Sequence, residues 1–258
     1  MSAPEALAIL LAGFGAGMIN AVVGSGTLIT FPTLLWAGYA PVTANVSNTL
    51  GLVAGGMAGS WGYRRELGGA GPTLRRLLPM SVVGAAAGAV LVIVLPPDVF
   101  EAAVPALIGV GALLVVTGPR LQAVLARNRP PAAAGPDMRP PGVALLVGVL
   151  LAGMYGGYFG AAQGVILIGL LSLLTTDSLH RINGYKNILA TAANIVGAFT
   201  FLLIARDEIV WPAVALIAVG SLIGGLVGAA LGRRIPTTPL RILVLVISII
   251  AIAAFVTR

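Results

Sequence analysis

Residues 13–61 constrain the fold more than any other stretch, because they place polar residues inside strongly apolar sequence. An apolar run ends at a Gly24-Ser25-Gly26 break, and a short apolar segment leads to a polar seam and then to glycines at four-residue spacing. The polar seam consists of Thr43, Asn45, Ser47, Asn48 and Thr49. Polar groups inside an apolar bundle are costly unless they pair or line a cavity. The stretch therefore predicts a polar site enclosed by apolar helices.

The composition assigns these apolar runs to a membrane. Of the 258 residues, 58% are hydrophobic and 9% are charged, and the mean hydropathy is +1.03. A soluble domain of this size cannot bury so much apolar sequence, and long apolar runs do not fit the alternating pattern of a transmembrane β-barrel. We therefore expect an all-α polytopic membrane protein in a lipid bilayer. The net charge of +7 requires no nucleic acid partner, since basic cytoplasmic loops produce the same excess.

Residues 153–201 repeat the design of the first stretch. An offset of 136 residues sets Gly24 on Gly160, and an offset of 138 sets Asn45 on Asn183 and Asn48 on Lys186. The chain is therefore predicted to contain two related transmembrane repeats, residues 1–118 and 142–258. A cytoplasmic linker rich in proline, alanine and arginine, residues 119–141, joins them.

Each half is predicted to contain five helical segments. They are 6–23, 28–37, 44–61, 77–95 and 102–117 in the first half, and 142–159, 165–174, 182–205, 210–231 and 240–256 in the second. An odd number per half inserts the second half upside down, which gives two inverted repeats of about five transmembrane or half-membrane helices. We expect the short segments to continue across the bilayer, because a re-entrant path for both would move the last basic loop to the opposite side.

The charged residues divide between the two sides of this arrangement. The loops around 62–76, 118–141 and 232–241 hold 11 of the 15 Lys and Arg residues, whereas the opposite side carries Asp98, Glu101, Asp207 and Glu208. The positive-inside rule then places the basic loops in the cytoplasm of a bacterial inner membrane protein and both termini outside. Because the first residues, MSAPEALAI, lack a basic region, we expect the first apolar run to be a retained helix and not a cleaved signal peptide.

The two glycine-rich breaks are the candidate anion-binding elements. Each precedes a segment too short to span, and a helix that starts at mid-depth offers free N–H groups and a positive dipole end. Ordinary glycine turns between hairpin helices are the alternative. The other glycines at four-residue spacing are predicted to let helices pack closely. The sequence leaves open whether some of them also form the contact of a homodimer.

Two titratable residues stand near these breaks. Lys186, the only lysine, either faces a cavity and balances an anion or snorkels to the cytoplasmic rim, and its alignment with Asn48 favours the cavity. His180, the only histidine, is the candidate for proton coupling, although a residue at a helix entrance is more often a cap or interfacial. The predicted substrate-binding residues are Asn20, Gly24, Ser25, Gly26, Asn45, Asn48, Thr49, Gly160, Gln163, Asn183, Tyr185, Lys186 and Asn187.

Several chemistries lack the residues that they need. The apolar segments contain no Asp or Glu, and the chain has no cysteine, no His-Glu-x-x-His motif, no Gly-x-Ser-x-Gly elbow and no Walker sequence. We therefore predict no catalytic residue, no metal site and no cofactor, and we do not expect an enzyme or an ATP-driven pump.

The sequence resembles a known family of membrane proteins. The run GMINAVVGSGTLITFP at 17–32, followed by TAN at 43–45 and GYRRE at 62–66, resembles the TauE/SafE family of sulfite exporters, and LHRIN at 179–183 with Lys186-Asn187 looks like its second repeat. The glycine clusters depart from the family pattern, since they read Gly-Ser-Gly and Gly-Ala-Ala-Gln-Gly. The resemblance implies a bacterial inner-membrane permease that exports sulfite, sulfonates or related small organic anions.

The expected mechanism is alternating access around a site at the middle of the membrane. An interior-negative potential alone favours anion export by about 2.3 kcal/mol per charge per 100 mV. A passive anion channel and a membrane scaffold that transports nothing are the alternatives.

Overall fold

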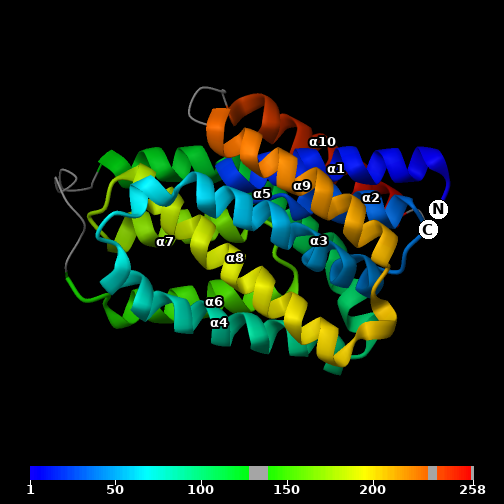
Figure 1. Cartoon of the computed structure of the whole chain (residues 1–258), viewed down its shortest axis with the longest axis horizontal. Coiled ribbons are helices and arrows are strands. Elements are labelled where there is room, and N and C mark those ends of the chain that lie inside the picture. Colours follow the sequence, from blue (N-terminus) through cyan, green and yellow to red (C-terminus); the bar gives the residue numbers. More distant parts are fainter. Residues whose placement is uncertain (128–138, 232–236, 257–258) are drawn as a thin grey trace.

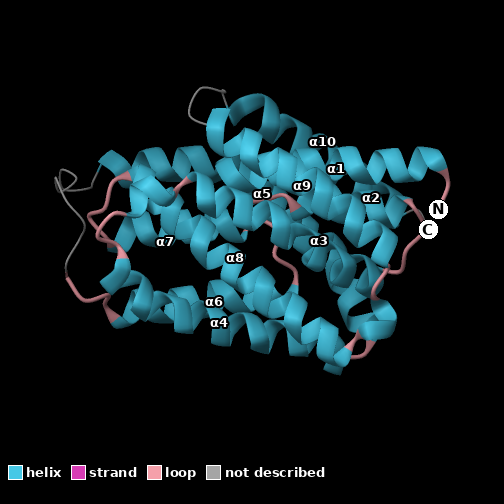
Figure 2. Cartoon of the chain, viewed as in Figure 1, coloured by secondary structure: helices cyan, strands magenta, loops and turns pink. Residues whose placement is uncertain are grey.

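The computed structural model describes residues 1–127, 139–231 and 237–256 (Figures 1 and 2). All regular secondary structure within these residues is helical. The helices are α1 (Ala3–Val22), α2 (Thr27–Trp36), α3 (Pro41–Gly62), α4 (Gly71–Val94), α5 (Pro97–Arg127), α6 (Val143–Tyr158), α7 (Gln163–Leu174), α8 (Leu179–Ile204), α9 (Trp211–Leu231) and α10 (Thr237–Val256), with 3-10 turns η1 (Arg64–Leu67) and η2 (Arg206–Glu208). By length and composition, α1, α4, α5, α8, α9 and α10 can each cross a membrane. The prediction of an all-α polytopic membrane protein is confirmed.

The helix bounds differ from the predicted ones mainly at two basic segments. Helix α4 begins at Gly71, with Pro72 in its first turn, so Arg75 and Arg76 lie on the helix and not in the loop before it. Leu77 is fully buried one turn later and holds this end of α4 in the bundle. Helix α5 continues to Arg127, so the first part of the predicted linker is helical. Arg129, Arg233, Arg234 and Arg258 lie outside the described residues.

The two short segments turn back instead of continuing across the bundle, which corrects the expected path. Gly26 at the start of α2 faces Ala16 near the end of α1, whereas Gly15 faces Ile29, so α2 runs antiparallel to α1. Gly156 likewise faces the first residue of α7, Gln163, and the earlier Gly148 faces Leu170.

Left-handed backbone at the breaks is the physical reason for this reversal. Gly24 has a φ of 88° and Gly160 a φ of 76°, conformations that glycine adopts without a steric penalty. Ala162 is also left-handed, with a φ of 60°. Each hairpin enters and leaves at the same end of the bundle. Every later loop therefore stays on the side where it would lie without the hairpin. The re-entrant path therefore leaves the basic loops on one side, contrary to the argument made from charge.

The helix contacts follow a regular pattern across the two halves. Helix α1 packs against α9, which also packs against α3, while α6 packs against α4, which also packs against α8. Helices α3 and α8 contact each other between these groups, and α2 contacts α10 as α7 contacts α5. Each of these contacts has a counterpart in the other half. If every helix is replaced by the one five places later, with α1 following α10, the same set of contacting pairs results.

Glycines allow the closest of these helix contacts. A Cβ atom on Gly224 of α9 would lie 1.9 Å from the Phe14 carbonyl oxygen of α1, and one on Gly88 of α4 would lie 2.0 Å from the Met154 carbonyl oxygen of α6. Real Cβ atoms do not approach an oxygen so closely, so the helices touch backbone to backbone. The predicted packing role is confirmed for these glycines.

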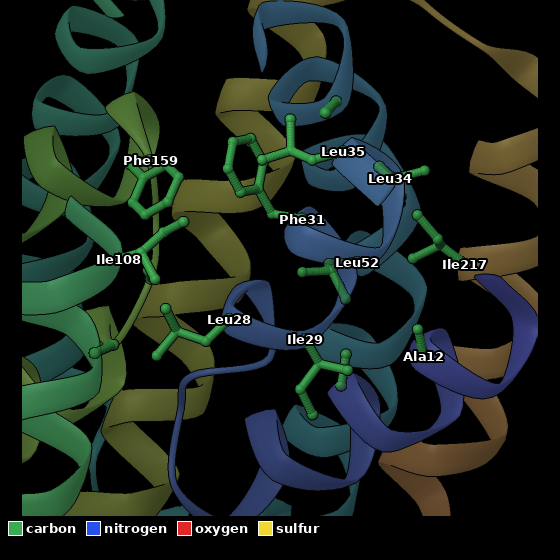
Figure 3. Packing of buried hydrophobic residues seen from close by; sticks show 14 of the residues in the cluster. Ala12, Leu28, Ile29, Phe31, Leu34, Leu35, Leu52, Ile108, Phe159 and Ile217 are labelled. Carbon is green, nitrogen blue, oxygen red and sulfur yellow. The ribbon is translucent and has the colours of Figure 1, made fainter. Parts of the chain in front are cut away.

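Helix α2 lies in the interior of the bundle despite its shortness. Leu28, Phe31 and Leu34 are fully buried, and Figure 3 places them among side chains of neighbouring helices such as Leu52 of α3. The Phe31 ring also meets the ring of Phe159 edge to face, with centroids 5.1 Å apart. Since Phe159 directly follows α6, this contact fixes the turn of the second hairpin against the first.

Candidate functional site

The turns of the two hairpins, residues 23–26 and 159–162, meet inside the bundle, and we call them the hairpin tips. The Gly164 amide, at the start of α7, donates a hydrogen bond of 3.1 Å to the carbonyl oxygen of Gly24. A Cβ atom on either glycine would lie 2.5 Å from the Cα atom of the other. Only glycine at both positions permits this approach.

A small polar cavity lies where the tips meet α3 and α8, and we call it the tip cavity. Its volume is about 20 Å³, which is room for about one water molecule. Its lining consists of Asn20, Gly24, Thr27, Gly56, Gly160, Gln163, Gly164, Asn187, Ala190, Thr191 and Asn194. The described conformation therefore leaves no room in the cavity for a ligand larger than about one water molecule.

The first turns of α2 and α7 carry polar side chains at this cavity. Gln163 is 3% exposed, and its Nε2 atom has no hydrogen-bond partner within the described residues. An amide N–H group is therefore available to a ligand in the cavity. On the other hairpin, Oδ1 of Asn20 accepts a hydrogen bond of 2.7 Å from the amide of Gly26 and fixes the start of α2. The Asn20 bond satisfies one of the backbone N–H groups that have no partner within their own helix at a helix start.

Lys186 lies beside the tip cavity but does not line it. Its side chain is 1% exposed, and Nζ donates hydrogen bonds of 3.0 Å to the carbonyl oxygens of Asn20 and Ala21, in the last turn of α1. A Cβ atom on Gly164 would lie 3.0 Å from Cδ of Lys186, so the lysine passes directly against the start of α7. The ammonium group therefore stabilises the negative end of the α1 dipole and stays inside the bundle.

Residues of the polar seam hold the tips from the α3 side. Asn45 is fully buried and donates from Nδ2 to the Tyr158 carbonyl oxygen, 3.0 Å away at the end of α6. Asn48 bonds to the hydroxyl groups of Thr30 and Thr27, the latter at 3.3 Å. Neither asparagine lines the tip cavity: Asn45 holds the backbone at the end of α6, and Asn48 holds two side chains of α2.

Helix α8 contributes a polar stripe that the sequence analysis recognised only in part. Asn187, which was predicted, lines the cavity, and its Nδ2 atom donates to the Ala21 carbonyl oxygen at 3.3 Å. Thr191 and Asn194 follow it by four and seven residues and line the same cavity. This spacing places three polar side chains on one face of a helix, and it predicts from the sequence that they lie together. Thr27 and Gly56 were also missed.

The remaining predicted residues lie away from the cavity wall. Thr49 bonds to the Asn45 carbonyl oxygen of its own helix, and Ser25 is buried within the first hairpin tip without lining the cavity. Asn183 bonds to the Leu179 carbonyl oxygen in the first turn of α8, where His180 is exposed. Tyr185 is buried on the side of α8 that faces Thr73 and Asp177. The tip cavity therefore collects Asn20, Gly24, Gly160, Gln163 and Asn187 from the predicted set.

The chemistry available here is hydrogen bonding and charge balance. Two helix N-termini, the Gln163 amide and a buried ammonium group favour a negatively charged ligand. Across residues 1–127, 139–231 and 237–256, no group of three His, Asp or Glu side chains is placed to hold a metal ion.

Comparison with known proteins identifies the family of the chain. The family model described as sulfite exporter TauE/SafE matches residues 9–255. The probable membrane transporter protein ORF9 of Sinorhizobium sp is 30% identical over 225 residues, which cover 86% of this chain and 80% of that protein. A probable membrane transporter protein of Haemophilus influenzae is 27% identical over 257 residues, 98% of this chain and 95% of its own length. YfcA of Escherichia coli K12, another probable membrane transporter protein, is 26% identical over 216 residues, 84% and 76% of the two chains. This chain is a multi-pass membrane protein of a transporter family and not an enzyme, and it belongs to the sulfite exporter TauE/SafE family.

Proposed function

We propose that this protein carries small anions, such as sulfite, sulfonates or related organic anions, across the membrane by alternating access around the tip cavity. The observation that carries the proposal is the buried amine of Lys186 beside the Gln163 amide, unpaired within the described residues, where the two hairpin tips meet, because a cation and a hydrogen-bond donor together stabilise an anion away from water. The family description, sulfite exporter, agrees with an anionic substrate.

An inverted repeat accounts for the closed geometry of the site. The offset of 136 residues sets the ends of α1 and α6, the glycines at 24 and 160 and the starts of α2 and α7 on one another. The matching helix contacts of the two halves support the same relation. We take residues 1–118 and 142–258 as the repeats, with the segment 119–141 between them. In many transporters, two such halves rock about a central site.

The charges at the two ends of the bundle favour one orientation. Arg64, Arg65 and Arg75 are exposed at one end, whereas the other end exposes Asp98 and Glu101. The positive-inside rule then places the basic end in the cytoplasm and both termini outside. The exposed Trp36, Trp61 and Trp211 lie at helix ends, where tryptophan sits at membrane interfaces.

A hydrogen-bonded latch at each end joins the two proposed repeats. At the basic end, Arg181 donates to the Glu66 carbonyl oxygen of η1 at 3.3 Å and pairs with buried Asp177 at 3.2 Å. At the terminal end, Thr43 of α3 donates to the Glu208 carboxylate of η2. The offset of 138 sets Thr43 on Arg181, so the two latches occupy corresponding positions.

The latches suggest how access alternates. With both closed, the cavity holds no more than a water molecule. Opening the terminal-end latch lets the tips separate toward the outside, and opening the basic-end latch admits an anion from the cytoplasm. A carrier requires that the two latches do not open together.

Counterflow in proteoliposomes tests this function. Vesicles preloaded with unlabelled sulfite or methanesulfonate are expected to accumulate the same labelled anion transiently, because an alternating-access carrier exchanges faster than it returns empty. Conductance without counterflow would instead indicate a channel. Inserted protein that moves no anion of a panel including sulfite, sulfonates and carboxylates would contradict the proposal.

A further inference from the structure

Helix ends and one lysine determine the electrostatics of the tip cavity. The N-terminal ends of α2 and α7 each carry about +0.5 of a charge, and the C-terminal ends of α1 and α6 about −0.5 each. These four ends meet at the hairpin tips, so their sum is close to zero. The buried amine of Lys186 adds one whole positive charge when it is protonated.

The acidic residues of the described chain do not neutralise that charge. They occupy connections, 3-10 turns or the first two turns of helices: Glu5, Glu66, Asp98, Glu101, Asp177, Asp207 and Glu208. Asp177 already pairs with Arg181 and precedes Lys186 by nine residues, more than two helical turns. Within the described residues, Nζ of Lys186 donates hydrogen bonds only to the neutral carbonyl oxygens of Asn20 and Ala21. With its amine protonated, Lys186 therefore gives the centre of the bundle a net charge of +1 that no described carboxylate offsets.

Gln163 supplies an independent indication that this charge serves a ligand. Its buried Nε2 atom lies at the cavity without a hydrogen-bond partner in the described residues, and a buried donor without a partner is costly. An anion oxygen in the cavity would accept this bond. The ligand would then lie against Gly164, where a Cβ atom would be 3.0 Å from Cδ of Lys186.

We infer that the tip cavity selects anions with one negative charge and discriminates against those with two. The inference rests on the proposed function and narrows its substrate class to monoanions such as sulfonates or simple carboxylates. A monoanion brings the enclosed site to neutrality, whereas a dianion leaves an uncompensated charge in a low-dielectric interior. Such a charge is strongly unfavourable.

Matched pairs of anions in the same proteoliposomes test the inference. Methanesulfonate and sulfate share a tetrahedral shape and differ by one charge, as propionate and malonate do among carboxylates. We expect the monoanion of a transported pair to exchange at least tenfold faster than its dianion at equal concentration. We also expect uniport to move one negative charge per anion.

A charge variant provides the second arm. Lys186→Met keeps the length of the side chain and removes its charge, so monoanion exchange should fall at least tenfold in protein that elutes as a single folded species. If that variant fails to fold, the comparison of the anion pairs in the wild-type protein still tests the selectivity for monoanions. Equal or faster exchange of the dianions would overturn the selectivity but leave the transport function standing. Failure of all four anions and of sulfite in inserted protein would overturn both.

Discussion

Gly164→Ala is expected to abolish or strongly reduce anion transport, whereas Gly169→Ala in the same helix should leave it unchanged. The added Cβ atom at 164 would lie 2.5 Å from Cα of Gly24 and 3.0 Å from Cδ of Lys186, so the hairpin tips must move apart. At 169 there is no atom within 4 Å. Overpacking of this kind costs about 1–3 kcal/mol, and each 1.4 kcal/mol is a factor of ten in rate.

Initial rates of counterflow for the two variants, normalised to inserted protein, provide the measurement. A loss of tenfold or more at 164 with wild-type rates at 169 would agree with a functional contact between the tips. Wild-type transport by correctly inserted Gly164→Ala protein would show that transport does not depend on the meeting of the tips.

The second large effect concerns folding. Gly224→Ala places a Cβ atom 1.9 Å from the Phe14 carbonyl oxygen, so α9 and α1 cannot keep their contact. We expect a loss of stability of about 1–3 kcal/mol, visible as a lower midpoint of thermal unfolding in detergent. The matched control is Gly109→Ala in α5, where the nearest atom is Cδ1 of Ile252 at 3.9 Å. Equal midpoints for the two variants would mean that the α1–α9 contact is looser than described.

The sequence predicted the helices well because apolar runs and glycine breaks determine where a membrane helix begins and ends. The end of α1 and the start of α2 fall within one residue of the predicted bounds, and the same holds for the end of α6. The direction of the chain after each break did not follow from apolar length. It depends on left-handed backbone at Gly24 and Gly160, which composition does not reveal.

The candidate site was predicted in part for a related reason. The sequence identifies polar residues in apolar surroundings but not the partner that each one meets. Asn48 bonds to Thr27 and Thr30, and Lys186 to the carbonyls that end α1, because α2 and α1 fold back within reach of them. Thr191 and Asn194 could have been predicted from their spacing with Asn187.

Accessibility of a single cysteine at the tip cavity tests alternating access most directly. The chain has no cysteine, so Thr191→Cys introduces one thiol into the cavity wall without other changes. The control is Val219→Cys on the outer surface of α9, where the native side chain is 52% exposed and faces lipid in a membrane.

The measurement is the rate at which membrane-impermeant thiol reagents react from each side of oriented vesicles. We predict that the cysteine at 191 reacts from both sides, that a transported anion slows both reactions, and that the cysteine at 219 reacts from neither. Reaction at 191 from one side only, or at rates that a transported anion does not change, would contradict a central site reached alternately from the two sides.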